Sequence, residues 1–298
     1  MLQESELRKI PEGKDYWLVD RESREEFKGN LDTISFMIRD VEVGNDKTLI
    51  IAGPCAVHSR KQTLTIAEKV KEAGADMLRG GAYKPRTSPY SFQGLGEKGL
   101  KILAEARELT GLPIVTEVMD PRLVELIGQY TDVFQIGARN MQNFPLLIEV
   151  GKYAARHDKG VLLKTSLMPK LKEVLCAAEY LAMEGAEKIM ICERGISVTT
   201  GSTRNTPHPS FVRELRQATY LPILGDPSHS TGDRELVEHT SDMYLAAKAN
   251  GLLIDVIRDD EPEMIGGNEV CDHKQGLPAS RFKAYMGLLK DKDGSGQD

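Results

Sequence analysis

Four side chains of the kinds that bind transition metals are scattered along the sequence. They are a thiol, an imidazole and two carboxylates, contributed by Cys55, His229, Asp255 and Asp272. This mixed set suits a borderline divalent ion such as Mn, Fe, Co or Zn better than Ca or Mg, which prefer oxygen ligands alone. No two of them have the close spacing of a metal motif, so Cys55 could instead be a buried small residue and His229 a rim imidazole. Asp226, three residues before His229, could fix the tautomer of that imidazole.

The second chemically informative set is cationic and is scattered in the same way. It consists of Arg79, Lys84, Arg86, Arg139, Lys164 and Arg194. In a chain with a formal net charge of −6, such a cluster would repel itself unless it bound anions, and the arginine fork fits the oxygens of phosphate and carboxylate. More than one phosphate is therefore implied. The alternative is that each cation pairs with a neighbouring Asp or Glu at the rim of the fold.

Lys164 has a further possible role of its own. A lysine at the end of a buried strand could form a Schiff base with a ketone if neighbouring cations depress its pKa. The same neighbours make a phosphate-binding role equally consistent with the sequence.

Apart from Asp272, both sets lie at or near the ends of short apolar runs, and these runs alternate with segments of helical period such as LTIAEKVKEAG. The runs are LIIAGP, MLRGGAY, PIVTEVM, VFQIGA, VLLKTS, KIMICER, PILGDPSH and LLIDVI. Eight strand-then-helix units predict an α/β fold, a closed (β/α)8 TIM barrel. An open doubly wound sheet is the alternative, but neither a GxGxxG nor a GxxxxGK[ST] phosphate loop is present. In a barrel the carboxyl ends of the strands meet on one face, so the scattered polar residues should share one pocket.

The pattern also predicts the domain organisation. Residues 1–45 are charge-rich and weakly periodic and are expected to form an N-terminal extension, with SREEFKGN a helix or turn. Residues 46–290 should form the catalytic barrel and 291–298 a flexible tail. About 45 residues leave little room for a regulatory domain, so we expect no strong feedback inhibition by aromatic amino acids.

Composition narrows the location and the partners. The negative net charge argues against nucleic acid or an acidic membrane as a partner. No stretch has the length and apolarity of a signal peptide or a membrane span, so we expect a cytoplasmic protein. The four cysteines include no CxxC pair and are interpreted as thiols.

Several long motifs carry a resemblance to a known family. They are AGPCAV (52–57), MLRGGAYKPRTSPYSFQGLGEKGL (77–100), TEVMDP (116–121), QIGARNMQNFPLL (135–147), ICERGI (191–196), TRNT (203–206) and DPSHSTG (226–232). Together they resemble 3-deoxy-D-arabino-heptulosonate 7-phosphate (DAHP) synthase of the class Iβ type, which is related to 3-deoxy-octulosonate 8-phosphate synthase. The resemblance covers about residues 49–289. It implies a metal-dependent transferase that condenses phosphoenolpyruvate with erythrose 4-phosphate, the first step of the shikimate pathway of aromatic amino acid biosynthesis.

The resemblance also implies roles for individual residues. Arg139, Lys164 and Arg194 would hold the phosphate of phosphoenolpyruvate, with Arg79 and Lys84 at its carboxylate and enol side. Arg86 and Thr87 of KPRTS would hold the aldose phosphate, with Pro85, Glu117 and Asn205 also binding substrate. Lys84, Lys164 and His229 would be catalytic. Cys55, His229, Asp255 and Asp272 would hold the metal, for which we expect Mn²⁺, with Fe²⁺, Co²⁺ or Zn²⁺ as alternatives. The family usually forms dimers or tetramers, so the resemblance also implies a homodimer or homotetramer.

Three departures from the family pattern lie next to this site. Asp255 replaces the usual glutamate ligand, His58 precedes Ser59 where the family has Glu-Ser, and Thr165-Ser166 replaces Arg-Gly or Asn-Gly. These changes keep open a paralogue that uses a different phosphorylated aldehyde in a specialised pathway. An imine-forming aldolase using Lys164 and a non-catalytic barrel that binds phosphorylated metabolites are further alternatives.

Overall fold

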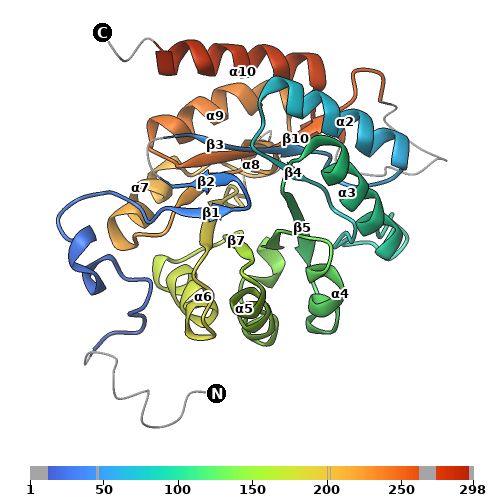
Figure 1. Ribbon diagram of the computed structural model, residues 1–298. Helices are drawn as coiled ribbons and strands as arrows, with labels where there is room; N and C mark the ends of the chain where they lie inside the picture. The colour runs from blue at the N-terminus through green and yellow to red at the C-terminus, as the bar shows by residue number, and fades with distance from the viewer. Residues whose placement is uncertain (1–12, 45–46, 200, 202, 262–272, 295–298) are drawn as a thin grey trace.

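Eight parallel strands form a closed ring in the computed structural model, which describes residues 13–44, 47–199, 201, 203–261 and 273–294 (Figure 1). In order around the ring they are β3 (Leu49–Gly53), β4 (Met77–Arg79), β5 (Ile114–Val118), β6 (Val133–Ile136), β7 (Gly160–Lys164), β8 (Ile189–Glu193), β9 (Ile223–Gly225) and β10 (Gly251–Ile257). The ring closes because β10 pairs in parallel with both β9 and β3. The predicted (β/α)8 barrel is therefore confirmed, and each of the eight apolar runs overlaps one of its strands.

The strands are apolar because both of their faces are covered. Every residue of β3, β5, β7, β8 and β10 is buried. One set of side chains fills the interior of the barrel, including Ile51, Met77, Val115, Leu162 and Leu253. Neighbouring strand residues point outward into a larger cluster shared with the helices. This two-sided burial explains why the runs are nearly continuous rather than alternating.

Helices surround the ring of strands in Figure 1. They are α2 (Arg60–Ala73), α3 (Glu97–Thr110), α4 (Val124–Gly128), α5 (Phe144–His157), α6 (Leu171–Met183), α7 (Pro209–Ala218), α8 (Pro227–Thr231), α9 (Val237–Ala246) and α10 (Ala279–Gly294). Local capping sets several of their ends. The hydroxyl of Ser59 accepts a hydrogen bond from the N–H of Gln62 at the start of α2, and left-handed Gly74 ends that helix. No helix in the described part of the chain is long and apolar enough to cross a membrane.

α10 ends later than the sequence predicted. The flexible tail was predicted to begin at residue 291, but α10 continues to Gly294. The polar segment Lys290–Asp293 contains neither glycine nor proline, so nothing in its sequence ends the helix before Gly294. Residues 295–298 lie outside the described residues.

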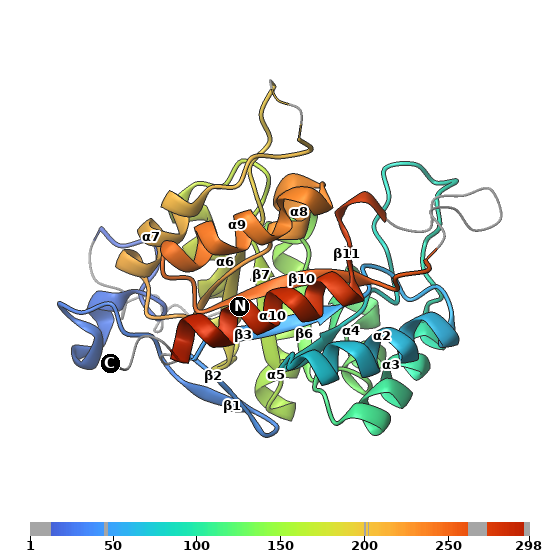
Figure 2. The same ribbon diagram turned by 90° about the horizontal axis from the view of Figure 1, so that it is seen from above.

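The N-terminal segment packs against the amino ends of the barrel strands. One short 3-10 helix, η2 (Glu25–Phe27), lies within the SREEFKGN segment (23–30), and another, η1 (Arg21–Ser23), ends at its first residue. The hairpin of β1 (Phe36–Ile38) and β2 (Val41–Val43) follows. Its side chains Ile38 and Val43 are buried in the same cluster as the barrel interior. In Figure 2 the hairpin lies at the opposite end of the barrel from the loops that follow β4 and β8.

Glu179 of α6 attaches the segment before η1 to the barrel. Its Oε1 accepts hydrogen bonds from the backbone N–H groups of Trp17 and Leu18, both at 2.9 Å, and its Oε2 accepts one from Val19 at 3.1 Å. The carboxylate is almost fully buried. Three bonds to one buried anion make this a specific attachment that no sequence motif indicates.

We expect Glu179→Gln to lower the free energy of unfolding by about 1–3 kcal/mol, because the amide loses the charge and turns an NH₂ group toward backbone donors. Urea denaturation at neutral pH measures this change. Glu173→Gln is the matched control, because Glu173 lies on the same helix in a loose surface ion pair with Lys170. Equal losses in the two variants would show that the three bonds contribute nothing specific.

Candidate active site

A cavity of about 320 Å³ lies at the carboxyl ends of the barrel strands, where the sequence predicted the site. The side chains that line it come from six strand ends and the loops that follow them. They include Arg79, Lys84, Pro85, Arg86, Thr87, Glu117, Arg139, Lys164, Arg194 and His229. Among the predicted substrate-binding residues, only Asn205 does not line the cavity. Asn205 is buried beside it, and its side-chain amide donates to the carbonyl of His229 at 2.9 Å.

Strand register explains how distant residues meet at this rim. Lys164, the last residue of β7, is paired with Cys192, and Cys192 is paired with Leu224, two residues before Asp226. The ammonium of Lys164 therefore reaches the carboxylate of Asp226, with Nζ and Oδ2 2.5 Å apart. On the other side of the barrel, Asp255 is paired with Gly53, two residues before Cys55.

Four of the cations that line the cavity fall into two groups. Arg79 and Lys164 pair with the buried carboxylates of Asp255 and Asp226, as the ion-pair alternative anticipated. Arg139 and Arg194 form no ion pair with any residue that the structure describes. Burial lowers the pKa of Arg194, and Arg204 adds to this, while Asp226 opposes it. An anion supplied by a ligand would offset that cost.

Among the buried side-chain donors without a partner in the described part of the chain, two belong to residues of the cavity. They are Nη1 of Arg194 and Nε of Arg79, both on residues that line the cavity. A buried N–H without a partner costs roughly 1–3 kcal/mol, so such groups are expected where a ligand supplies the acceptor. Anionic oxygens fit these positions.

Glu117 is the one carboxylate among the described residues that line the cavity. Its Oε2 accepts a long hydrogen bond from Gln135 at 3.4 Å. Gly137 makes room for it, because a Cβ at that position would lie 1.9 Å from Oε1 of Glu117. The glycine of QIGARN thus allows one negatively charged group to stand among many cations.

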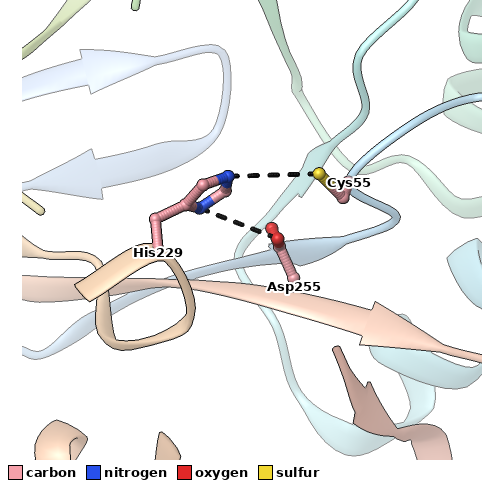
Figure 3. Close-up of side chains that lie close together, drawn as sticks. All are labelled: Cys55, His229 and Asp255. Carbon is pink, nitrogen blue, oxygen red and sulfur yellow. Dashed lines mark hydrogen bonds and ion pairs between the residues drawn. The ribbon is translucent and has the colours of Figure 1, made fainter. Parts of the chain in front are cut away.

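Cys55, His229 and Asp255 form a compact cluster (Figure 3). Of the three, His229 also lines the cavity. The thiol sulfur lies 4.0 Å from Nε2 of His229, and Nδ1 of His229 lies 3.7 Å from Oδ2 of Asp255. All three ligand atoms lie within 4.8 Å of one another. Ligands that share one ion at bond lengths near 2.0–2.3 Å are about 3.3–3.8 Å apart, so small side-chain adjustments suffice. The donor set and geometry fit a divalent metal.

Asp272, the fourth predicted ligand, lies outside the described residues. His58, in contrast, is described and is not part of the cluster. Its Nε2 lies 2.7 Å from Oε1 of Glu261, and both side chains are largely buried. The departure at position 58 therefore forms a hydrogen bond between the loops after β3 and β10.

Asp226 organises the imidazole of the cluster. It begins α8, where its Oδ1 accepts a hydrogen bond from the backbone N–H of His229 at 2.9 Å, and Pro227 occupies the first helical turn. Its Oδ2 also lies 2.9 Å from Nδ1 of His229. Nδ1 therefore carries the proton and Nε2 remains the nitrogen that faces Cys55, which is the orientation a metal ligand requires. The possible tautomer-fixing contact noted from the sequence is present.

Burial and neighbouring charges shift the pKa values of Asp226, His229 and Asp255. Burial alone would raise the pKa of Asp226, but His229 and Lys164 outweigh it and hold that pKa far below its usual value. Burial would likewise lower the pKa of His229, whereas the carboxylates of Asp226 and Asp255 raise it overall. Burial raises the pKa of Asp255 despite the opposing charge of Arg79. Asp226 is thus the firmly ionised centre of this region.

Several buried residues of the site were not predicted from the sequence. The phenol of Tyr244 donates to Glu193 and lies 2.5 Å from the hydroxyl of Ser230, which donates to the carbonyl of Asp226 at 2.6 Å. The place of Glu193 at the end of a predicted strand could have indicated a site residue. Tyr244 lies within a helix, where nothing in the sequence indicates a role in the site. Gln275 was also missed, although it follows Asp272 by only three residues.

Comparisons with known proteins agree with this geometry. A family model described as the DAHP synthetase I family matches residues 21–292. A phospho-2-dehydro-3-deoxyheptonate aldolase of Thermotoga maritima is 45% identical over 277 residues, which cover 93% of this chain and 77% of that protein. A 2-dehydro-3-deoxyphosphooctonate aldolase of Francisella tularensis subsp. holarctica is 29% identical over 276 residues, which cover 86% of this chain and 95% of that protein.

Solved structures give the same result. The crystal structure of the Thermotoga maritima DAHP synthase has a TM-score of 0.84 and 41% identity, covering 94% of this chain and 77% of that one. A truncated form of the Thermotoga maritima enzyme has a TM-score of 0.82 and 39% identity, covering 95% of this chain and 98% of that one. The resemblance carried by the motifs is thereby confirmed, and the chain belongs to the DAHP synthetase I family.

Proposed function

We propose that this protein condenses phosphoenolpyruvate with erythrose 4-phosphate to give DAHP and phosphate, with a divalent metal, as the first step of the shikimate pathway. One observation carries the proposal. A cavity rich in cations, with a single carboxylate among its described lining residues, lies against a cluster of thiol, imidazole and carboxylate. Two phosphorylated substrates and a metal-activated carbonyl require this combination.

The cations divide naturally between two anionic substrates. Arg139, Lys164 and Arg194 would bind the phosphate of phosphoenolpyruvate, with Arg79 at its carboxylate. Arg86 and Thr87, on the loop after β4, would bind the phosphate of the aldose. Lys84 lies between the substrate side and the metal cluster, with Nζ 2.9 Å from the carbonyl oxygen of Cys55 and 3.3 Å from its sulfur.

The cluster would hold the metal through Cys55, His229 and Asp255, with Asp272 as the fourth ligand proposed from the sequence. A bound divalent ion would supply Lewis-acid polarisation of the aldehyde carbonyl, and Mn²⁺ is the ion we propose. Asp226 would keep the proton of His229 on Nδ1, so that Nε2 is available.

The residues of the cavity would then guide the bond changes. C3 of phosphoenolpyruvate attacks the aldehyde carbon, and the aldehyde oxygen takes a proton from the ammonium of Lys84. Water adds to C2 while Glu117 accepts one of its protons. The C2 hydroxyl of the resulting intermediate then gives its remaining proton to the departing phosphate as the bond between C2 and the phosphate oxygen breaks, which leaves a ketone. The cations bring the two anionic substrates together and stabilise the departing phosphate.

The contacts of Lys164 disfavour the imine-forming alternative. Its ammonium lies 2.5 Å from the fully buried carboxylate of Asp226. An ammonium held by such a partner is a poor amine nucleophile, whereas it is well suited to binding phosphate.

The proposal is tested by turnover. Protein reconstituted with Mn²⁺ should release phosphate from phosphoenolpyruvate when erythrose 4-phosphate is present, and mass spectrometry should detect DAHP. The comparison panel contains arabinose 5-phosphate and ribose 5-phosphate. Turnover with one of these but not with erythrose 4-phosphate would favour the paralogue with another aldehyde. Borohydride trapping in the same mixture should leave Lys164 unlabelled.

A pair of arginine variants separates the two anion sites. We expect Arg139→Ala to raise KM for phosphoenolpyruvate by about 10–100-fold and Arg86→Ala to raise KM for the aldose phosphate by a similar factor, because each loses one charge-assisted contact. Initial rates with one substrate varied and the other saturating measure both constants. Each variant is the control for the other, and exchanged effects would refute the assignment.

Asp226→Asn tests the buried carboxylate shared by Lys164 and His229. The asparagine keeps the shape of the side chain but removes the charge, so kcat/KM should fall by at least about 100-fold as both partners lose their orientation. Steady-state kinetics measure the change, and circular dichroism shows whether the variant folds. Asp233→Asn is the matched control, because Asp233 caps the neighbouring 3-10 helix η5 (Arg234–Leu236) outside the cavity. A folded Asp226→Asn enzyme with unaltered kcat/KM would contradict the assigned role.

A further inference from the structure

Gln275 lies between two of the proposed metal ligands, although no motif marks it. It is the last residue of the 3-10 helix η6 (His273–Gln275), and its side chain is fully buried. Its Nε2 lies 2.5 Å from Oδ2 of Asp255 and 3.9 Å from the sulfur of Cys55. Its Oε1 lies 3.4 Å from Nη1 of Arg204. One amide therefore contacts the carboxylate, the thiol and a cation of the cavity wall.

The backbone around Gln275 is fixed close to β10. Two residues later, the short strand β11 (Leu277–Pro278) pairs with β10, with Leu277 opposite Val256. Val256 follows Asp255, so this register places Gln275 beside the carboxylate. The intervening Gly276 permits the approach, since a Cβ there would lie 2.6 Å from Cγ2 of Ile257. The sequence Gln-Gly-Leu thus holds the amide against the cluster.

The contacts also determine which way the amide points. An arginine can only donate hydrogen bonds, so the group of Gln275 that faces Arg204 must be the oxygen. The NH₂ group must then face Asp255 and Cys55. In the reverse orientation, the amide oxygen would face a carboxylate oxygen at 2.5 Å, which is repulsive.

The carboxylate of Asp255 is held at both oxygens. Arg79 donates to Oδ1, and Gln275 donates to Oδ2, which is the oxygen that lies 3.7 Å from the imidazole of His229. An aspartate has one methylene fewer than a glutamate to bring its oxygens into position. Its direction is therefore set by these two donors rather than by the reach of its own side chain.

We propose that Gln275 is a positioning residue, which orients Asp255 and Cys55 for metal binding while Arg204 fixes the direction of its amide. This inference rests on the metal site of the proposed function. Hydrogen-bonded partners of metal ligands typically change metal affinity by about 10–100-fold when they are removed. Gln275 acts through the ligands and does not itself touch substrate.

The test measures Co²⁺ binding to the full-length protein without substrates. Calorimetry gives the dissociation constant, and the near-ultraviolet charge-transfer band of a cobalt–thiolate bond reports on Cys55. We expect Gln275→Met, which keeps the length but loses the donors, to raise the dissociation constant by about 10–100-fold and to change this band. Gln275→Asn, whose amide is too short to reach both ligands, should act in the same direction.

Lys274→Met is the matched control, because it makes the same substitution at the neighbouring, exposed residue. It should bind Co²⁺ like the wild type. Circular dichroism and unfolding without added metal separate loss of the fold from loss of the site. Folded Gln275→Met and Gln275→Asn proteins with wild-type affinity and spectrum would overturn the inference while leaving the metal site intact. A wild-type protein without the thiolate band would overturn the metal site and this inference together.

Discussion

The buried carboxylate of Asp226 is the interaction on which the rest of the site depends. It begins α8, directs the imidazole of His229 and balances the ammonium of Lys164. A charge with no exposed surface is tolerated only because these partners surround it. The partners depend on Asp226 in turn, since Lys164 and His229 would lose their orientation without its carboxylate. Chemistry and stability are therefore combined in a single group.

Much of this arrangement could be predicted because the carboxyl ends of all strands in a parallel barrel lie on the same face. Arg79, Glu117, Lys164 and Arg194 each end or follow an apolar run, so their convergence followed from topology alone. Their division between internal ion pairs and free donors could not be predicted. Whether a cation meets a carboxylate depends on register and rotamer, as the pairing of Lys164 with Asp226 shows.

The residues that were missed share a physical reason. Gln275 reaches the cluster through the pairing of β11 with β10, and Tyr244 reaches Glu193 from the middle of a helix. Neither position interrupts an apolar run, and a glutamine or a tyrosine has many roles in proteins. Two of the three departures from the family pattern have partners in the structure. His58 has a partner in Glu261, and the short Asp255 has two donors that define its direction.

The hairpin of β1 and β2 affects how substrates and products can enter and leave the cavity. Ile38 and Val43 join Ile51, Leu162 and the other apolar side chains that fill the barrel below the cavity. Within the described part of the chain, this packing closes the amino-terminal end of the barrel, so the barrel is not an open channel. Reactants, water and products would then exchange through the same mouth, between loops that already carry Arg86 and Thr87. The rate of product release would then depend on the space between these loops as well as on the affinity of the cavity for the product.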